Sequence, residues 1–71
     1  MNLTFDYAKL KGWMRERGIT MEKLSRSTGI GFSTIAVKLS QGRPFTTDQA
    51  WRIAQALELP DIDPYFFVVK L

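Results

Sequence analysis

The stretch STGIGFSTIAVKLSQG, residues Ser27–Gly42, decides the fold. Glycine is the residue type that most readily takes the left-handed conformation at the end of a helix, so one helix is expected to end at Gly29. Apolar residues then recur at helical spacing, with Ile35 and Leu39 one turn apart, and predict a second helix over residues 32–40. Two short helices joined by a turn around a glycine form the helix-turn-helix arrangement, in which the first turn of the second helix stays exposed.

The helix before this turn is expected to begin after Thr20, a residue type that accepts a hydrogen bond from a free amide of the first helical turn. Met21, Leu24 and Thr28 share one face of this helix. The helix after the turn has Gly31 at its N-cap, a weaker cap than serine or threonine.

An earlier helix is predicted to be capped by Asp6 and to end at Gly18. Apolar residues at helical spacing mark its inner side: Tyr7, Leu10 and Met14. Trp13 lies one position off this stripe, and Trp51 lies one position off the stripe of a later helix. Both tryptophans are therefore expected at the boundary of the core.

The later helix has the clearest start of all. Thr46 followed by Gln49 is a capping box, in which each residue bonds a free amide of the other. A four-residue apolar stripe follows it, made by Ala50, Ile53, Ala54 and Leu57, and Pro60 is expected to end the helix. Beyond it, Pro64 is expected at the first position of one short helical turn, with three residues folding back on the core: Ile62, Phe66 and Phe67.

Both ends of the chain favour β structure, through NLTF (residues 2–5) and FFVVKL (residues 66–71). Two alternatives stand open for the second segment. It pairs with the first in a small ribbon within the chain, or its apolar side chains form an interface between two chains.

Charge is divided unevenly along the chain. Residues 9–43 hold eight basic and two acidic side chains, a net charge of +6, whereas residues 44–71 hold two basic and four acidic ones, a net charge of −2. Clustered Lys and Arg concentrate the field that attracts phosphates, so the basic part suggests a face for a polyanion. Chance clustering on a solvated surface is the alternative.

The 71 residues include no cysteine and no histidine, which excludes disulfides, thiol nucleophiles and imidazole acid–base chemistry. The carboxylates show no convincing pairing and there is no glycine-rich phosphate loop, so we expect neither an enzyme nor a bound cofactor, metal or small-molecule ligand. No apolar run approaches the roughly 18 residues of a membrane span, and the N-terminus lacks the build of a signal peptide. We expect one soluble, intracellular domain.

The segment TMEKLSRSTGIGFSTIAVKL, residues 20–39, resembles the helix-turn-helix of the phage Cro/C1-type repressors. The resemblance extends to small phage repressor-like proteins through residues 7–12, 39–46 and 65–67, and so covers nearly the whole chain. Met21 stands where many relatives have a glutamine that opens the second helix, and Gly31 stands where the third helix usually has a capping serine. The resemblance implies a single all-α domain over residues 1–71, a compact lambda-repressor-like bundle of four to five helices.

Carried onto this sequence, the recognition surface of the family places four residues toward the major groove: Phe32, Ser33, Ala36 and Val37. Small apolar side chains read thymine methyl groups, and a serine bonds either base edge. Phe32 has the alternative role of covering the gap between the two helices, and Val37 that of a residue at the edge of the core. The residues expected at phosphates are Thr34, Lys38, Arg43, Lys23 and Arg26, of which the last two are equally compatible with ordinary solvated charges.

The resemblance implies a sequence-specific double-stranded DNA-binding transcriptional regulator, a repressor that occupies an operator through the helix of residues 32–40 and excludes RNA polymerase. Its expected partners are operator DNA and, on a palindromic site, a second copy of the chain. Its expected place is the cytoplasm of a bacterial host, at the nucleoid. The alternative is a protein-interaction module, of an anti-repressor or antitoxin-like kind, whose binding depends little on salt, whereas DNA binding weakens steeply as salt rises.

Overall fold

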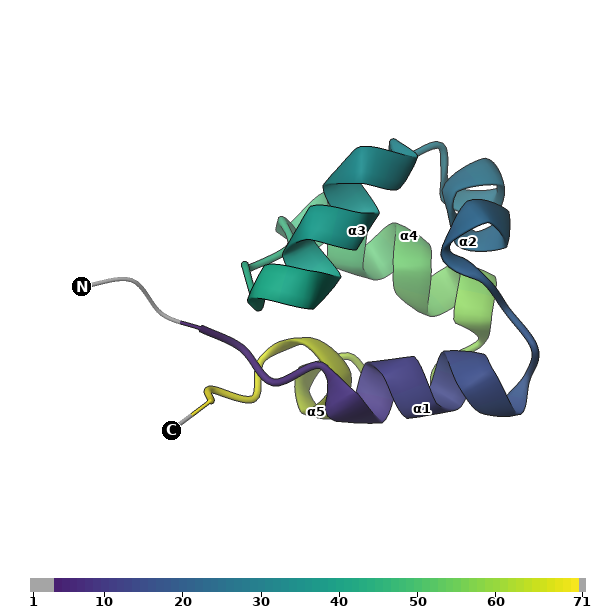
Figure 1. Ribbon diagram of the computed structural model, residues 1–71. Coiled ribbons are helices and arrows are strands. Elements are labelled where there is room, and N and C mark those ends of the chain that lie inside the picture. Colours follow the sequence, from purple (N-terminus) through teal and green to yellow (C-terminus); the bar gives the residue numbers. More distant parts are fainter. Residues whose placement is uncertain (1–3, 71) are drawn as a thin grey trace.

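The computed structural model describes residues 4–70, which form five α-helices and no sheet. In chain order the helices are α1 (Ala8–Glu16), α2 (Met21–Thr28), α3 (Phe32–Gln41), α4 (Thr47–Leu57) and α5 (Asp63–Phe66). They gather into a body of 32 × 23 × 20 Å, with α2 and α3 above α1 and α5 in the view of Figure 1. This confirms the predicted all-α class. No helix in the described part of the chain has the length and apolar composition to cross a bilayer.

Local sequence sets the starts of α2 and α4 as predicted. The Thr20 hydroxyl accepts a hydrogen bond from the Lys23 amide at 3.2 Å, and Gly29 ends α2 in the left-handed conformation, with a φ of 76°. At α4, Thr46 and Gln49 form the complete capping box. These caps fix both ends of α2 and the start of α4.

The start of α1 lies one residue later than predicted. Tyr7 is the N-cap, and Asp6 instead accepts a hydrogen bond from the Ala8 amide at 2.9 Å. The aspartate therefore still satisfies an amide at the start of the helix, from a position one residue earlier. Gly18 follows the helix in the left-handed conformation, with a φ of 65°.

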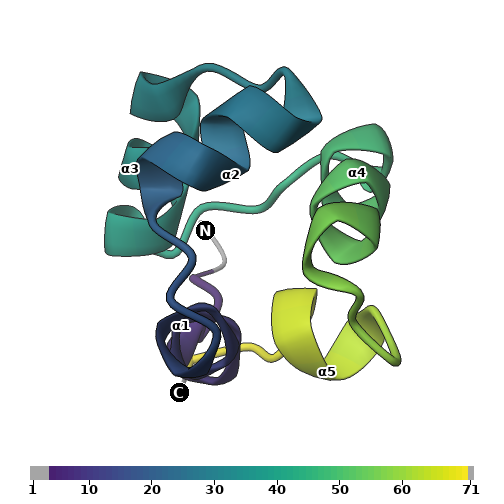
Figure 2. The same cartoon turned by 90° about the vertical axis from the view of Figure 1, so that its right-hand side faces the viewer.

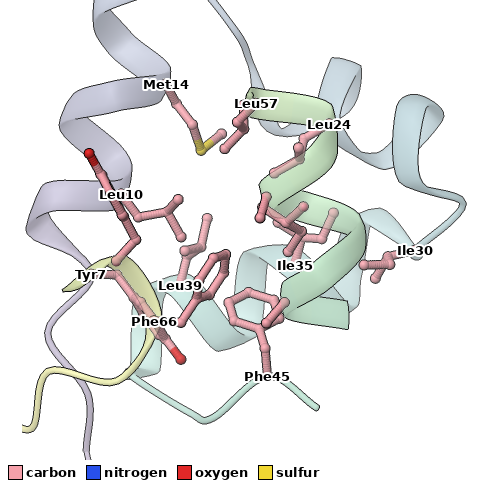
Figure 3. Close-up of a cluster of buried hydrophobic side chains, with 14 residues drawn as sticks. Tyr7, Leu10, Met14, Leu24, Ile30, Ile35, Leu39, Phe45, Leu57 and Phe66 are labelled. Atoms are coloured by element: carbon pink, nitrogen blue, oxygen red, sulfur yellow. The ribbon is translucent and has the colours of Figure 1, made fainter. Parts of the chain in front are cut away.

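The core joins all five helices and the loop between α3 and α4, as Figure 3 shows. The predicted stripe of α4 is buried, and Phe66 of α5 is fully buried among the residues contributed by the other helices. The ring of Phe45 meets Phe66 edge-on at 5.7 Å and Tyr7 at 5.5 Å between centroids. These aromatic contacts hold the N-terminal segment, the loop and α5 together.

The two tryptophans behave differently. Trp13 is half-buried, and its indole N–H donates to the Leu57 carbonyl at 2.8 Å, which confirms its predicted place at the boundary. Trp51 is 55% exposed, so the same prediction is wrong for this residue. The reason is tertiary: α4 turns its small and branched residues, Ala50 and Ile53, into the core, and more than half of the Trp51 surface is left uncovered.

The end of α4 differs from the prediction. The helix stops at Leu57, three residues before Pro60, because Glu58 takes the left-handed conformation, with a φ of 54°. Its amide donates to carbonyls of the last turn, which closes the helix. The proline therefore follows a helix that has already ended.

The short helix α5 begins at Asp63, so Pro64 is its second residue and not its first. Phe66 is buried and Ile62 is half-buried, as predicted. Phe67, however, is 42% exposed, and the prediction that it folds into the core is wrong. Because α5 ends at Phe66, the Phe67 ring lies on the surface, 6.1 Å from the ring of Phe5.

The predicted terminal ribbon is reduced to one antiparallel bridge between Phe5 and Val69. Two backbone hydrogen bonds of 2.7 Å flank it: Asp6 N–H to Val68 O, and Lys70 N–H to Thr4 O. The Phe5 amide also donates to the Gly42 carbonyl at 2.7 Å, so the bridge is attached to the end of α3. The part of the prediction on residues 2, 3 and 71 lies outside the described residues.

Candidate nucleic-acid interface

Side-chain hydrogen bonds fix the turn between α2 and α3. The Ser25 hydroxyl donates to the Ile30 carbonyl at 2.6 Å. The Thr28 hydroxyl donates to the Leu24 carbonyl at 2.7 Å and accepts from the Ile30 amide at 3.2 Å. Because these hydrogen bonds tie the turn to α2, α3 leaves α2 at one defined angle.

The helix α3 is anchored along one side and open along the other. Ile35 and Leu39 are buried, as predicted, while Phe32 is 50% exposed and Val37 is 42% exposed. Ser33 is exposed beside them. In Figure 2, α3 lies along the edge of the molecule opposite α4. Phe32 and Val37 thus each expose about half of their surface to solvent.

Two of the remaining candidates on α3 lie at the margins of this open side. Ala36 is half-buried and lines a hollow that α3 shares with α1 and the start of α2. Thr34 is exposed beside Gly31, the N-cap, which offers no side-chain acceptor to the first amides of α3. Those amides are therefore available to an external acceptor such as a phosphate.

Lys38 is positioned by α4. Its ammonium donates to the Gln49 side-chain oxygen at 2.6 Å and lies 5.4 Å from the centre of the Phe45 ring. An ammonium group has three donors, so this hydrogen bond leaves two for another acceptor. Gln49 thus holds the charge at the junction of α3 and α4.

Arg43 lies just after α3, with its side chain exposed and its Nε donating to Gln41 at 2.9 Å. Its carbonyl accepts a hydrogen bond from the Tyr7 hydroxyl at 2.5 Å. Burial raises the pKa of this hydroxyl above its ordinary value near 10, so it stays protonated and donating to a higher pH than an exposed tyrosine does. Tyr7 therefore fixes the backbone from which the Arg43 guanidinium extends.

Lys23 and Arg26 lie on the exposed surface of α2. The Lys23 ammonium approaches the Gly18 carbonyl at 3.4 Å, and Arg26 forms an ion pair with Glu22 one turn earlier. A neighbouring carboxylate weakens the attraction of Arg26 for a phosphate, so its local environment favours the solvated alternative.

Two basic residues that the sequence analysis did not single out lie beside the open side of α3. Lys11 and Arg15 of α1 line the hollow that also contains Ala36 and Ser40 of α3. In the sequence they were recognisable only as members of the basic stretch of residues 9–43. They are far from α3 along the chain, so the sequence does not show that they lie close to it in space. Among residues 4–70, neither takes part in an ion pair.

Compared with known proteins, the chain matches no family model, and no curated protein is significantly similar to it in sequence. Within the described residues, no three acidic side chains converge closely enough to hold a metal ion. The surface consists of an open helix side with polar and apolar groups, flanked by cations.

Proposed function

We propose that the protein is a sequence-specific double-stranded DNA-binding transcriptional regulator that inserts α3 into the major groove. The observation that carries the proposal is the arrangement of α3, whose buried Ile35 and Leu39 hold it against the core while Phe32, Ser33 and Val37 stay exposed. A helix about 10 Å wide with side chains fits the major groove of B-DNA, which is about 12 Å wide.

The side chains on α3 suit base reading more than general attraction. Ser33 donates to or accepts from a base edge, and the Val37 methyl groups suit contact with a thymine methyl group. Sequence would thus be read by uncharged groups. Affinity would come from the flanking cations, chiefly Lys38 and Arg43 at one end of α3 and Lys11 and Arg15 alongside it.

Selection of bound duplexes from a random DNA pool at physiological salt tests the proposal. We expect enrichment of a short motif by the native chain. Val37→Asp places a carboxylate against bases and phosphates, and we expect it to weaken binding about tenfold or more, the loss of one specific base contact. The matched control is Val68→Asp. Val68 is 44% exposed and Val37 is 42% exposed, but Val68 lies in the C-terminal segment and not on α3. Equal losses for the two variants, or no enriched motif, would refute base reading by α3.

The salt dependence of binding tests the phosphate contacts. We expect the slope of log K against log salt to fall by about one for each of Lys38→Ala and Arg43→Ala. Lys9→Ala is the control, because its ammonium lies 4.9 Å from the centre of the Tyr65 ring, on the side of α1 that faces α5. An unchanged slope would show that the substituted residue does not contact a phosphate.

The apolar character of the same surface supports a second candidate, a protein-interaction module. Phe32 and Val37 are both large, apolar and about half exposed, which suits a protein partner as well as a base. This candidate predicts binding that changes little with salt and no enrichment from the DNA pool.

A further inference from the structure

A basic hollow lies between α1, the start of α2 and α3. Its volume is about 420 Å³, and most of its lining is apolar: Met14, Ile19, Met21, Ala36 and Leu39. Lys11 and Arg15 stand at its rim and form no ion pair within residues 4–70. An apolar floor below two cations suits a large apolar side chain flanked by carboxylates. The apolar side chain would pack on the floor, and the carboxylates would pair with the cations.

The same chain carries a surface of that composition, here called the Trp51 face. Trp51 is the most exposed of the large apolar residues in the described part of the chain. It borders a surface depression of about 530 Å³ together with three carboxylate residues: Glu58, Asp61 and Asp63. None of these acids belongs to the ion pairs within residues 4–70, and no three acidic groups there converge as metal ligands would.

We infer that the Trp51 face of one copy docks into the basic hollow of another. The indole would lie on the apolar floor, and the carboxylates around it would approach the cations at the rim. The two surfaces complement each other in charge, and both also offer apolar side chains. Large exposed aromatic residues are also typical of the centre of an interface.

The two surfaces lie on different sides of the molecule. In Figure 2, α1 and α3, which form the hollow, lie on the left, and α4, which carries Trp51, lies on the right. Contact between two different surfaces is heterologous, so each bound copy still offers one free hollow and one free Trp51 face. The product is a head-to-tail chain of copies that grows with concentration.

The association is expected to be weak and sensitive to salt. A single aromatic residue and a few rim charges form an interface of the small, transient class. Exposed charge pairs are screened as the Debye length falls from about 14 Å near 50 mM salt to below 6 Å near 300 mM. Self-association should therefore be strongest at high protein concentration and low salt.

A consequence for DNA binding rests on the proposed function. Met21 and Ala36 line the hollow, and Ala36 belongs to α3. A copy seated there would cover one margin of the surface that α3 offers to the major groove. Self-association and DNA binding by the same chain would then compete.

Sedimentation velocity without DNA tests the inference, so its failure is separate from any failure of DNA binding. At several hundred micromolar protein and about 50 mM salt, we expect the weight-average mass to rise above the 8.2 kDa monomer and to return toward it at about 300 mM salt. A mass that stays at the monomer value under all these conditions would overturn the inference.

Two variants provide the decisive comparison, because each removes one surface through exposed side chains. Trp51→Ser removes the indole, and the double variant Lys11→Glu with Arg15→Glu reverses the rim. We expect each variant alone to be monomeric, and their mixture to form a 1:1 dimer that grows no further, since only one intact surface remains on each.

Phe67→Ser is the matched control, because Phe67 is also a partly exposed aromatic residue, at 42%, in the C-terminal segment. We expect it to associate as the native chain does. Loss of association in Phe67→Ser, or no dimer in the mixture of the two variants, would show that copies meet elsewhere or not at all.

Discussion

Among the glycines of residues 4–70, Gly42 is the one where an added methyl group should destabilise the protein most. It ends α3 in the left-handed conformation, with a φ of 68°, and is buried beneath the N-terminal segment. A Cβ atom there would lie 2.5 Å from the Thr4 methyl carbon and 2.7 Å from the Phe5 carbonyl oxygen. Because the second contact is with backbone, a side-chain rotation cannot relieve it.

The cost of Gly42→Ala has two parts. The left-handed conformation costs a residue with a Cβ about 1–2 kcal/mol. Moving the N-terminal segment away would also weaken the hydrogen bond from the Phe5 amide to the Gly42 carbonyl, worth about 1 kcal/mol, and disturb the bridge to Val69. We expect a loss of about 2–4 kcal/mol in the free energy of unfolding, a large part of the stability of so small a domain.

Urea unfolding followed by circular dichroism measures this loss as a fall in the midpoint at unchanged slope. Gly18→Ala is the matched control, because Gly18 has nearly the same φ, 65°, but no atom within 4 Å of its Cβ position. It should lose only the conformational part, about 1–2 kcal/mol. Equal losses for the two variants would show that the N-terminal segment does not press on Gly42 in solution.

Three further substitutions test other parts of the fold by the same unfolding assay. Gly12→Ala should stabilise the protein by about 0.5–1 kcal/mol, because Gly12 lies inside α1 with no atom within 4 Å of its Cβ position; a destabilised variant would contradict this. Thr46→Ala removes the side-chain cap of α4 and should cost about 1 kcal/mol, so an unchanged midpoint would mean that water replaces the cap equally well. Tyr7→Phe removes the hydrogen bond to the Arg43 carbonyl and should cost about 1 kcal/mol at neutral pH. Burial raises the pKa of Tyr7 in the folded state, so above about pH 10 the unfolded chain loses this proton first and the native protein loses stability. The Tyr7→Phe variant should lose less stability over the same pH range. Curves of unfolding free energy against pH that run parallel for the two proteins from pH 9 to 11 would contradict the assignment.

The sequence by itself determined the helices and several of their ends. The Thr20 cap, the left-handed Gly29 and the capping box of Thr46 and Gln49 appear in the structure as predicted. Each of these features involves residues no more than four positions apart, so both partners of each interaction can be recognised in a short stretch of sequence. The apolar stripe of α4 was readable for the same reason, because helical geometry alone places its members on one side.

Only the tertiary structure decided which surfaces are covered. Trp51 and Trp13 each lie one position off an apolar stripe, yet one is exposed and the other donates to the Leu57 carbonyl, 44 residues away. Local pattern cannot distinguish them, because the difference depends on whether another element lies over that side of the helix.

The candidate site shows the same division. The sequence placed Phe32, Ser33 and Val37 on a helix with an exposed first turn, and all three are exposed. It could not place Lys11 and Arg15 beside α3, nor join the Lys38 ammonium to Gln49, because these neighbours come from different helices. The residues of a helix show by their own spacing which side is apolar, whereas the contacts between helices depend on how the whole chain packs.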